Sequence, residues 1–324
     1  MNDNFSKFTD KIGVFASPGS NVQVNTQNID GQKKLTPTKD IPYRGSVHFV
    51  GRETELTTIH EDLRRGNYVA ITGMGGLGKT ELVTQYAKEY QDHYDGIIWF
   101  NARQRILAAE VFELFTFKFG LEIPQTQGEK PLTLQQQVAW CWLQYPETQK
   151  PVLIVVDDLT DLTQLQDVVS PETRFRVLIT TRQQHLDPNS IQELPLEVLS
   201  PPIALELLQK QLGKNHQRIV NEPETATEIC EFLGNLPLGI ILVGSYLTTD
   251  LGLSLTQMLE RLQKRKLAET ALQKRETINQ TQLGIKAAFN LTWETLDTQT
   301  QYLGAFLSLF SPQFIFWDLV VWVI

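Results

Sequence analysis

The chain has 324 residues, of which 41% are hydrophobic and 20% are charged. It is therefore long and apolar enough to bury a sizeable core and to form two or three domains. Its 29 Lys and Arg residues stand against 37 Asp and Glu residues, which gives a formal net charge of −8. This negative net charge argues against binding of nucleic acid through the overall charge of the protein.

The two cysteines and the N-terminus bear on the cellular compartment. Cys141 and Cys230 are far apart and have no histidine at ligand spacing, which argues against a disulfide framework and a structural zinc site. The N-terminus is polar and shows no basic region followed by an apolar run, so no secretory signal is recognised. We therefore expect a cytoplasmic protein.

Residues 1–46 are predicted to form a flexible polar leader. Residues 19–28 are polar, and residues 33–42 carry two prolines among polar residues. Such a stretch buries too little apolar surface to offset the entropy lost on ordering it. A short strand that pairs elsewhere in the fold is the alternative.

Residues 47–200 alternate between short apolar runs and helical patterns. The runs that look like buried parallel strands lie at 68–72, 97–100, 151–156, 176–180 and 191–196. Helical patterns precede or separate them at 56–63, 82–90, 106–119 and 134–143, with a linker near 124–131. This alternation predicts an α/β domain with a mostly parallel sheet in a three-layer α/β/α arrangement.

After residue 200 the strand patterns stop and only helical patterns follow. They lie at 203–212, 225–233, 238–247, 254–272, 283–296 and 299–309, and predict a small all-α bundle over residues 201–298. Residues 305–324 are densely apolar, and about 20 such residues can span a bilayer. Ser311-Pro312-Gln313 and Asp318 interrupt this run and it has no basic flank, so we expect no membrane span.

The strongest motif is a glycine-rich loop between the first predicted strand and the helix after it. It reads Gly73-Met74-Gly75-Gly76-Leu77-Gly78-Lys79-Thr80 and matches G-x-x-x-x-G-K-[ST] at every fixed position. The glycines let backbone N–H groups surround a phosphate, and the start of the helix adds its positive dipole end. Lys79 is expected to reach the β- and γ-phosphates, and Thr80 to ligate Mg²⁺.

Two further strand ends carry charged side chains. The apolar run at 153–156 ends in Asp157 and Asp158, at the strand end where open α/β sheets bind ligands. Asp157 is predicted to hold Mg²⁺, and Asp158 to orient or deprotonate the attacking water. The next predicted strand ends in Thr180-Thr181-Arg182, and the Arg182 guanidinium is predicted to contact the γ-phosphate.

Two further short motifs are uninformative alone, but they complete a set of five motifs that occur in a particular order along the chain. These are Val50-Gly51-Arg52, before the first helical pattern, and Gly234-Asn235-Leu236-Pro237-Leu238, between two helices of the predicted bundle. Together with the loop, the aspartate pair and the arginine, they resemble the NB-ARC nucleotide-binding family over roughly residues 48–310. Its members are signal-transduction (STAND-class) P-loop ATPases of apoptotic activators, plant disease-resistance proteins and bacterial regulators.

The resemblance implies an adenine-nucleotide site with Mg²⁺, and it assigns roles to individual residues. The nucleotide contacts implied are Val50, Gly51, Arg52, Gly73, Met74, Gly75, Gly76, Leu77, Gly78, Lys79, Thr80, Glu81 and Pro237. Pro237 is expected to pack on the adenine, and Arg182 to sense the γ-phosphate. The catalytic residues implied are Lys79, Asp158 and Arg182, and the metal ligands are Thr80 and Asp157. Residues 299–324 resemble the start of the family's winged-helix domain, which this chain does not complete.

The resulting functional hypothesis is a signalling switch module that binds ATP or ADP with Mg²⁺ and hydrolyses ATP slowly. The resemblance also implies self-oligomerisation or a signalling protein as partner. A module that holds ADP without turnover and acts through partner binding is the alternative. A DNA-binding regulator fits less well, because of the net charge of −8 and the absence of a recognition-helix pattern before residue 48. GTP is disfavoured because the chain has no Asn-Lys-x-Asp motif.

Overall fold

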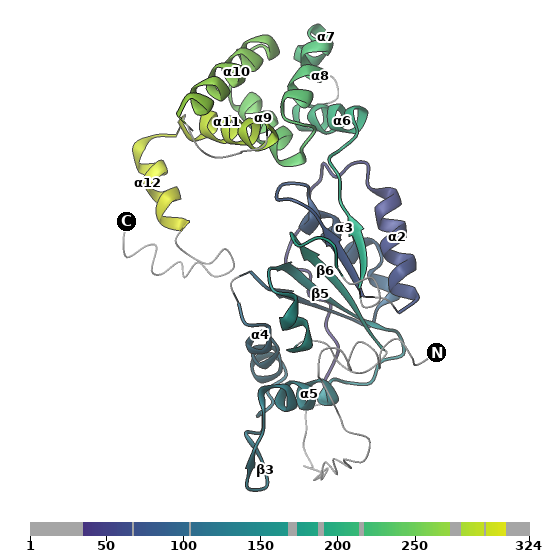
Figure 1. Ribbon diagram of the computed structural model, residues 1–324. Coiled ribbons are helices and arrows are strands. Elements are labelled where there is room, and N and C mark those ends of the chain that lie inside the picture. The colour runs from purple at the N-terminus through teal and green to yellow at the C-terminus, as the bar shows by residue number, and fades with distance from the viewer. Residues whose placement is uncertain are drawn as a thin grey trace. The chain divides into compact units, whose positions relative to one another are not determined.

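The computed structural model describes residues 35–66, 68–103, 105–167, 174–186, 191–213, 217–272, 280–294 and 296–308. At 267–272 and 280–282 it describes the backbone alone. The chain separates into two compact units, Met1–Glu197 and Val198–Ile324, which are treated one at a time (Figure 1). Expectations for residues 1–34 and 309–324, including most of the leader and the apolar C-terminal run, lie outside the described residues.

The first unit is built on a five-stranded sheet with the strand order β2-β5-β6-β1-β7 (Figure 1). All of its neighbouring strands run parallel, which confirms the predicted sheet. The strands are β1 (Val69–Thr72), β2 (Gly96–Asn101), β5 (Val152–Leu159), β6 (Phe175–Thr181) and β7 (Gln192–Pro195). The register places Asn101 beside Asp157, so the carboxyl ends of β2 and β5 meet at one edge.

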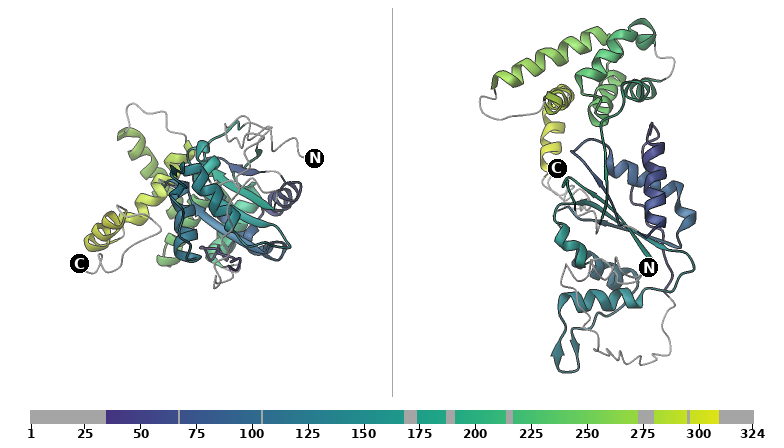
Figure 2. Two further views of the ribbon diagram at one scale, coloured as in Figure 1. Left: turned by 90° about the horizontal axis from the view of Figure 1, so that it is seen from below. Right: turned by 45° about the vertical axis from the view of Figure 1, so that its right-hand side comes forward.

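Helices cover both faces of this sheet (Figures 1 and 2). Helix α2 (Glu53–Arg64) contacts β1, β6 and β7, and α3 (Lys79–Glu89) contacts β5 and β6. On the other face, α4 (Leu107–Glu113) and α5 (Leu134–Gln144) pack on alternate strand residues such as Ile154. Successive side chains of a strand point to opposite faces. The nearly continuous apolar run of β5 therefore contributes side chains to the apolar layers on both faces of the sheet, as is typical of a strand that is buried on both faces.

The chain before β1 also joins the sheet. The backbone N–H of Ile97 donates to Thr38 O at 2.8 Å, and the N–H of Asp40 donates to Ile97 O at 2.9 Å. Lys39 forms a parallel bridge with Ile97 at the outer edge of β2. The pairing extends the described fold upstream of Phe49, where the sequence pattern changes.

Two local elements differ from the predicted patterns. Strands β3 (Thr126–Gln127) and β4 (Lys130–Pro131) form a small hairpin inside the predicted linker, where Gly128 takes a φ of 62° at the turn. The helical pattern at 106–119 becomes α4 followed by a π-helical turn at Leu114–Lys118. The described part of this unit also has 3-10 turns at Gln91–His93 and Leu162–Asp167.

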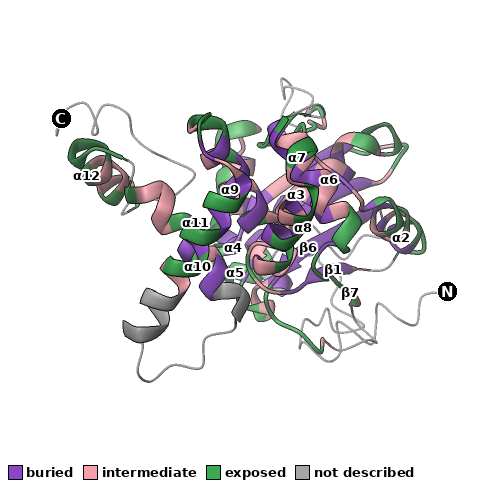
Figure 3. Ribbon diagram, turned by 90° about the horizontal axis from the view of Figure 1, so that it is seen from above, coloured by how far each residue is buried: buried purple, intermediate pink, exposed green. Residues whose placement is uncertain are grey.

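Within the described residues, helices alone form the second unit, as predicted. They are α6 (Pro201–Leu212), α7 (Gln217–Asn221), α8 (Pro223–Phe232), α9 (Pro237–Thr249), α10 (Leu255–Leu272), α11 (Gln280–Glu294) and α12 (Thr298–Leu307). Proline begins α6, α8 and α9, where its missing N–H has no helical partner to lose. Helix α12 has no buried residue (Figure 3). None of the described helices is long and apolar enough to cross a membrane.

Candidate functional site

The glycine-rich loop connects β1 to α3, and its backbone requires glycine. Gly73, Gly76 and Gly78 have φ values of 136°, 86° and 90°. A Cβ on Gly73 would lie 2.9 Å from the carbonyl oxygen of Leu196, so a side chain there would collide with backbone. The first helical hydrogen bond of α3 runs from Leu82 N to Gly78 O. The N–H groups of the first turn are therefore left for another acceptor, as at sites that bind anions.

Lys79 begins α3 and turns back onto the loop. Its Nζ donates to Gly73 O at 2.7 Å and to Met74 O at 2.9 Å, and the residue is 8% exposed. Burial lowers the pKa of its ammonium group, and the nearby Arg182 adds to the shift. The ammonium group is thus fixed against the loop in which a phosphate would lie.

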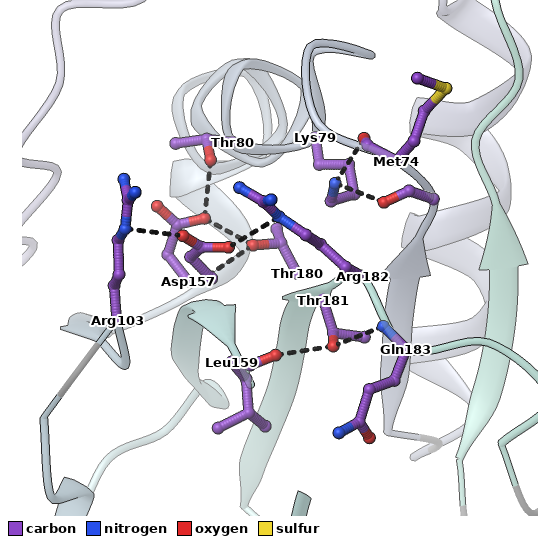
Figure 4. A network of polar contacts seen from close by, with 12 residues as sticks. Met74, Lys79, Thr80, Arg103, Asp157, Leu159, Thr180, Thr181, Arg182 and Gln183 are labelled. Atoms are coloured by element: carbon purple, nitrogen blue, oxygen red, sulfur yellow. Dashed lines mark hydrogen bonds and ion pairs between the residues drawn. The ribbon is translucent and has the colours of Figure 1, made fainter. Parts of the chain in front are cut away.

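Thr80 and Asp157 meet beside this loop (Figure 4). Thr80 Oγ1 donates to Asp157 Oδ1 at 2.8 Å, and Thr180 Oγ1 donates to the same oxygen at 2.6 Å. Burial raises the pKa of the Asp157 carboxyl, an effect that the two hydroxyl donors oppose. The hydroxyl and carboxylate oxygens are the hard donors that Mg²⁺ takes alongside phosphate oxygens and water, so these residues fit the predicted metal.

Asp158 lies next to this cluster in a strained conformation. Its φ is 54°, and its N–H donates to Thr180 Oγ1 at 2.8 Å. Two guanidinium groups flank its carboxylate, with Arg182 Nε 3.9 Å from Oδ1 and Arg103 Nε 3.6 Å from Oδ2. The Arg182 guanidinium also covers the loop, because a Cβ on Gly75 would lie 3.7 Å from its Cζ.

Of the other predicted contacts in the first unit, Arg52 is firmly anchored and Val50 is buried. Arg52 is 7% exposed, and it donates from Nη1 to Glu55 Oε1 and from Nη2 to Glu197 O, both at 2.6 Å. Gly51 between them has a φ of 61°. Glu197 directly follows Leu196, whose N–H donates to Thr72 O just before the loop, so Arg52 ties the Val50–Arg52 turn to the segment beside the loop.

Glu81 and Pro237 are placed differently from the loop residues. The Glu81 carboxylate accepts from Ser46 N at 2.6 Å and from Gln85 Nε2 at 2.7 Å. Only its backbone N–H, in the first turn of α3, is directed as an anion contact requires. Pro237 is the first residue of α9 in the second unit, after Asn235 with its left-handed φ of 53°. Its contact with a nucleotide stays a prediction.

Two contributors were not assigned from the sequence. Thr180 binds both aspartates, and Arg103 approaches Asp158 from the end of β2. A signal existed for Arg103, since it follows a predicted strand whose carboxyl end lies at the ligand-binding edge. Among the described residues, no group of three or more His, Cys, Asp or Glu side chains could hold a metal. A Mg²⁺ ion that is bound partly by phosphate oxygens and water needs only one or two protein ligands, so it does not require such a group.

A parallel sheet with this loop after β1 defines a P-loop nucleoside triphosphatase. The NB-ARC domain model matches residues 52–218, a span that includes the loop, both aspartates and Arg182. The chain belongs to the NB-ARC family of STAND-class P-loop ATPases, and it is a nucleotide-binding signalling module of that type.

Individual relatives are distant and much longer. The regulatory protein AfsR of Streptomyces griseus is 25% identical over 259 residues, covering 77% of this chain and 25% of that protein. Disease resistance RPP8-like protein 3 of Arabidopsis thaliana is 24% identical over 260 residues, covering 74% and 28%. A solved STAND protein with a tetratricopeptide repeat sensor from Pyrococcus horikoshii shares 18% identity at a TM-score of 0.49, covering 87% and 36%. The chain thus spans about a quarter of the length of these two curated relatives.

Proposed function

We propose that this chain is an ATP- and ADP-binding switch module that hydrolyses ATP slowly with Mg²⁺. The observation that carries the proposal is the hydrogen bond from Thr80 to Asp157, beside Lys79 at the start of α3. It supports one site in which phosphate and metal contacts lie next to each other. Family membership supports adenine nucleotide as the ligand.

Each residue at the sheet edge has a role in this proposal. Thr80 and Asp157 would hold Mg²⁺, which neutralises phosphate charge when bound. Lys79 binds the β- and γ-phosphates, and Arg182 contacts the γ-phosphate from the end of β6. Asp158 orients the attacking water, a role favoured by the hydrogen bond that holds its backbone N–H and by the two arginines beside its carboxylate.

The remaining assignments concern the adenine base, the partners of the module and its cellular compartment. Val50, Gly51 and Arg52 contact the adenine and ribose, and Pro237 packs on the adenine. Exchange of ADP for ATP changes the association of the module with itself or with a signalling protein. The protein works in the cytoplasm, with which its buried free thiols Cys141 and Cys230 are consistent.

Release of inorganic phosphate from Mg·ATP by the purified chain tests the enzymatic part. Slow release that is lost in Asp157→Ala supports the ATPase. The matched control is Asp161→Ala, which removes an exposed carboxylate just beyond β5 that accepts hydrogen bonds from the backbone N–H and the hydroxyl of Thr163. Bound ADP without any phosphate release would replace this proposal with the alternative, a module that holds ADP and acts through a partner.

A further inference from the structure

Asp158 is flanked by two arginines that come from different strands. Arg103 follows β2 and Arg182 follows β6, and each approaches a different carboxylate oxygen of Asp158. Figure 4 shows the two arginines reaching in from opposite sides of Asp157. The proposed function uses Arg182 for the terminal phosphate and gives Arg103 no role.

The backbone holds Arg103 in this position. The N–H of Ala102 donates to Asp157 O at 2.8 Å, which extends the pairing of β2 and β5 by one residue. The N–H of Arg103 then donates to the side-chain oxygen of Asn101 at 3.0 Å, which fixes the turn after the strand. Arg103 therefore leaves the sheet directly beside the two aspartates.

Both arginines are more exposed than the carboxylate between them, and they differ in what lies beside them. The Asp158 side chain is 24% exposed, whereas those of Arg103 and Arg182 are 54% and 62% exposed. Arg182 lies against Gly75 of the phosphate loop, and Arg103 is anchored on the β2 side. If Arg182 turns to a terminal phosphate, the Asp158 carboxylate keeps Arg103 as its cation.

A carboxylate beside a terminal phosphate repels it unless a cation neutralises the carboxylate. A nucleoside diphosphate has no group at that position and is affected less. We propose that Arg103 is a specificity-determining residue, which pairs with Asp158 and thereby lets the site accept a nucleoside triphosphate as well as a diphosphate. This inference rests on the proposed function, because it concerns the same nucleotide site.

The test is a double-mutant cycle on binding, which needs no turnover. Calorimetry of the nucleotide-stripped chain gives Kd values for Mg·ADP and for the non-hydrolysed Mg·AMP-PNP. The variants are Arg103→Ala, Asp158→Asn and the double variant, with Arg103→Lys as the conservative change, and asparagine tolerates the positive φ at position 158. Arg65→Ala is the matched control, because Arg65 is 66% exposed and pairs with Asp62. It lies before the amino end of β1, whereas the proposed nucleotide site lies at the carboxyl ends of the strands.

Arg103→Ala is expected to weaken AMP-PNP binding about fivefold and to change ADP binding less than about twofold. The loss should shrink to under about twofold in the Asp158→Asn background, and Arg103→Lys should retain most of the wild-type affinity. Arg65→Ala should change neither affinity.

An Arg103→Ala loss that persists in the Asp158→Asn background would overturn the inference, since Arg103 would then act on the phosphate directly. Equal losses for both nucleotides would overturn it as well, as would no loss for either. These outcomes leave the proposed nucleotide site intact. A folded wild-type chain that binds neither nucleotide would instead refute the proposed function itself.

Discussion

Thr80 Oγ1 donates a hydrogen bond of 2.8 Å to Asp157 Oδ1, although the two residues are 77 positions apart in the chain. Thr80 lies in the first turn of α3 and Asp157 near the carboxyl end of β5. The bond brings the two expected Mg²⁺ ligands together beside the phosphate loop. Metal dependence and phosphate binding should accordingly be coupled in this protein.

Asp157→Asn should abolish the effect of Mg²⁺ on nucleotide affinity, because asparagine keeps the shape of the side chain and removes its charge. The Kd of the variant in Mg²⁺ should equal its Kd in EDTA, whereas the wild type should bind more tightly with Mg²⁺ by about tenfold, roughly the strength of one charge-assisted contact. Calorimetry with and without the metal gives both values. A full Mg²⁺ effect in the variant would remove Asp157 from the metal site.

Lys79→Ala should weaken nucleotide binding by more than about tenfold, since it removes the ammonium group buried against the loop. Lys88→Ala is the control, as Lys88 lies in the last turn of the same helix. Circular dichroism would verify that both variants fold. Unchanged ADP affinity in Lys79→Ala would refute the phosphate role of this residue.

The pH dependence of stability should report on Asp157, whose carboxyl pKa is raised by burial above its ordinary value of 3.8. Between 3.8 and the raised value, the folded state holds this proton more tightly than the unfolded state. The contribution of Asp157 to the free energy of unfolding is therefore fully present below that window and falls as the pH rises through it. Urea denaturation of the nucleotide-free wild type should show this fall.

Asp157→Asn provides the comparison, because asparagine cannot titrate. The difference in unfolding free energy between wild type and variant should decline with rising pH in that window. A difference that is constant with pH, or that rises, would mean that the carboxyl pKa is not raised in the folded protein.

The sequence predicted the parts of the fold and site that local patterns encode. The parallel sheet follows from alternating apolar runs and helical periods, and the phosphate loop from closely spaced glycines before Lys79. Asp157 and Arg182 were expected at the ligand edge because each follows an apolar strand. The structure confirms the sheet and brings these side chains to one edge.

What the sequence did not predict depends on contacts between distant segments. Thr180 was identified only as part of a strand end, yet its hydroxyl joins both aspartates because β5 and β6 are neighbours in the sheet. A short paired strand before residue 47 was an alternative from the sequence, but its partner was not predicted, because Lys39 pairs with Ile97 at the edge of β2. No local periodicity encodes such a contact, because its partner is set by strand order.

Thr180→Val should lower the free energy of unfolding by about 1–3 kcal/mol. The Thr180 hydroxyl donates to the Asp157 carboxylate and accepts from the Asp158 N–H, and valine removes both hydrogen bonds. Thr84→Val is a milder control, because the Thr84 hydroxyl donates to the backbone carbonyl of Thr80 within α3. Urea midpoints of the three proteins check the prediction. Equal midpoints for wild type and Thr180→Val would show that this hydroxyl does not stabilise the site.

Pro237→Ala should weaken adenine-nucleotide binding by about 1–2 kcal/mol, as expected for one lost apolar contact and less than for Lys79→Ala. Pro223→Ala is closely matched, since Pro223 also begins a helix of the second unit. Calorimetry with ADP separates the two. Equal effects of both substitutions would assign the change to helix stability rather than to adenine packing.

One measurement tests the central claim most directly. The purified, folded protein is incubated with an equimolar mixture of Mg·ATP and Mg·GTP, desalted and then denatured, and the released nucleotide is identified. Chromatography of the released material should show ATP or ADP at close to one per chain for the wild type and almost none for Lys79→Ala. Guanine nucleotide in excess, or an empty wild-type protein that is folded by circular dichroism, would contradict an adenine-nucleotide switch.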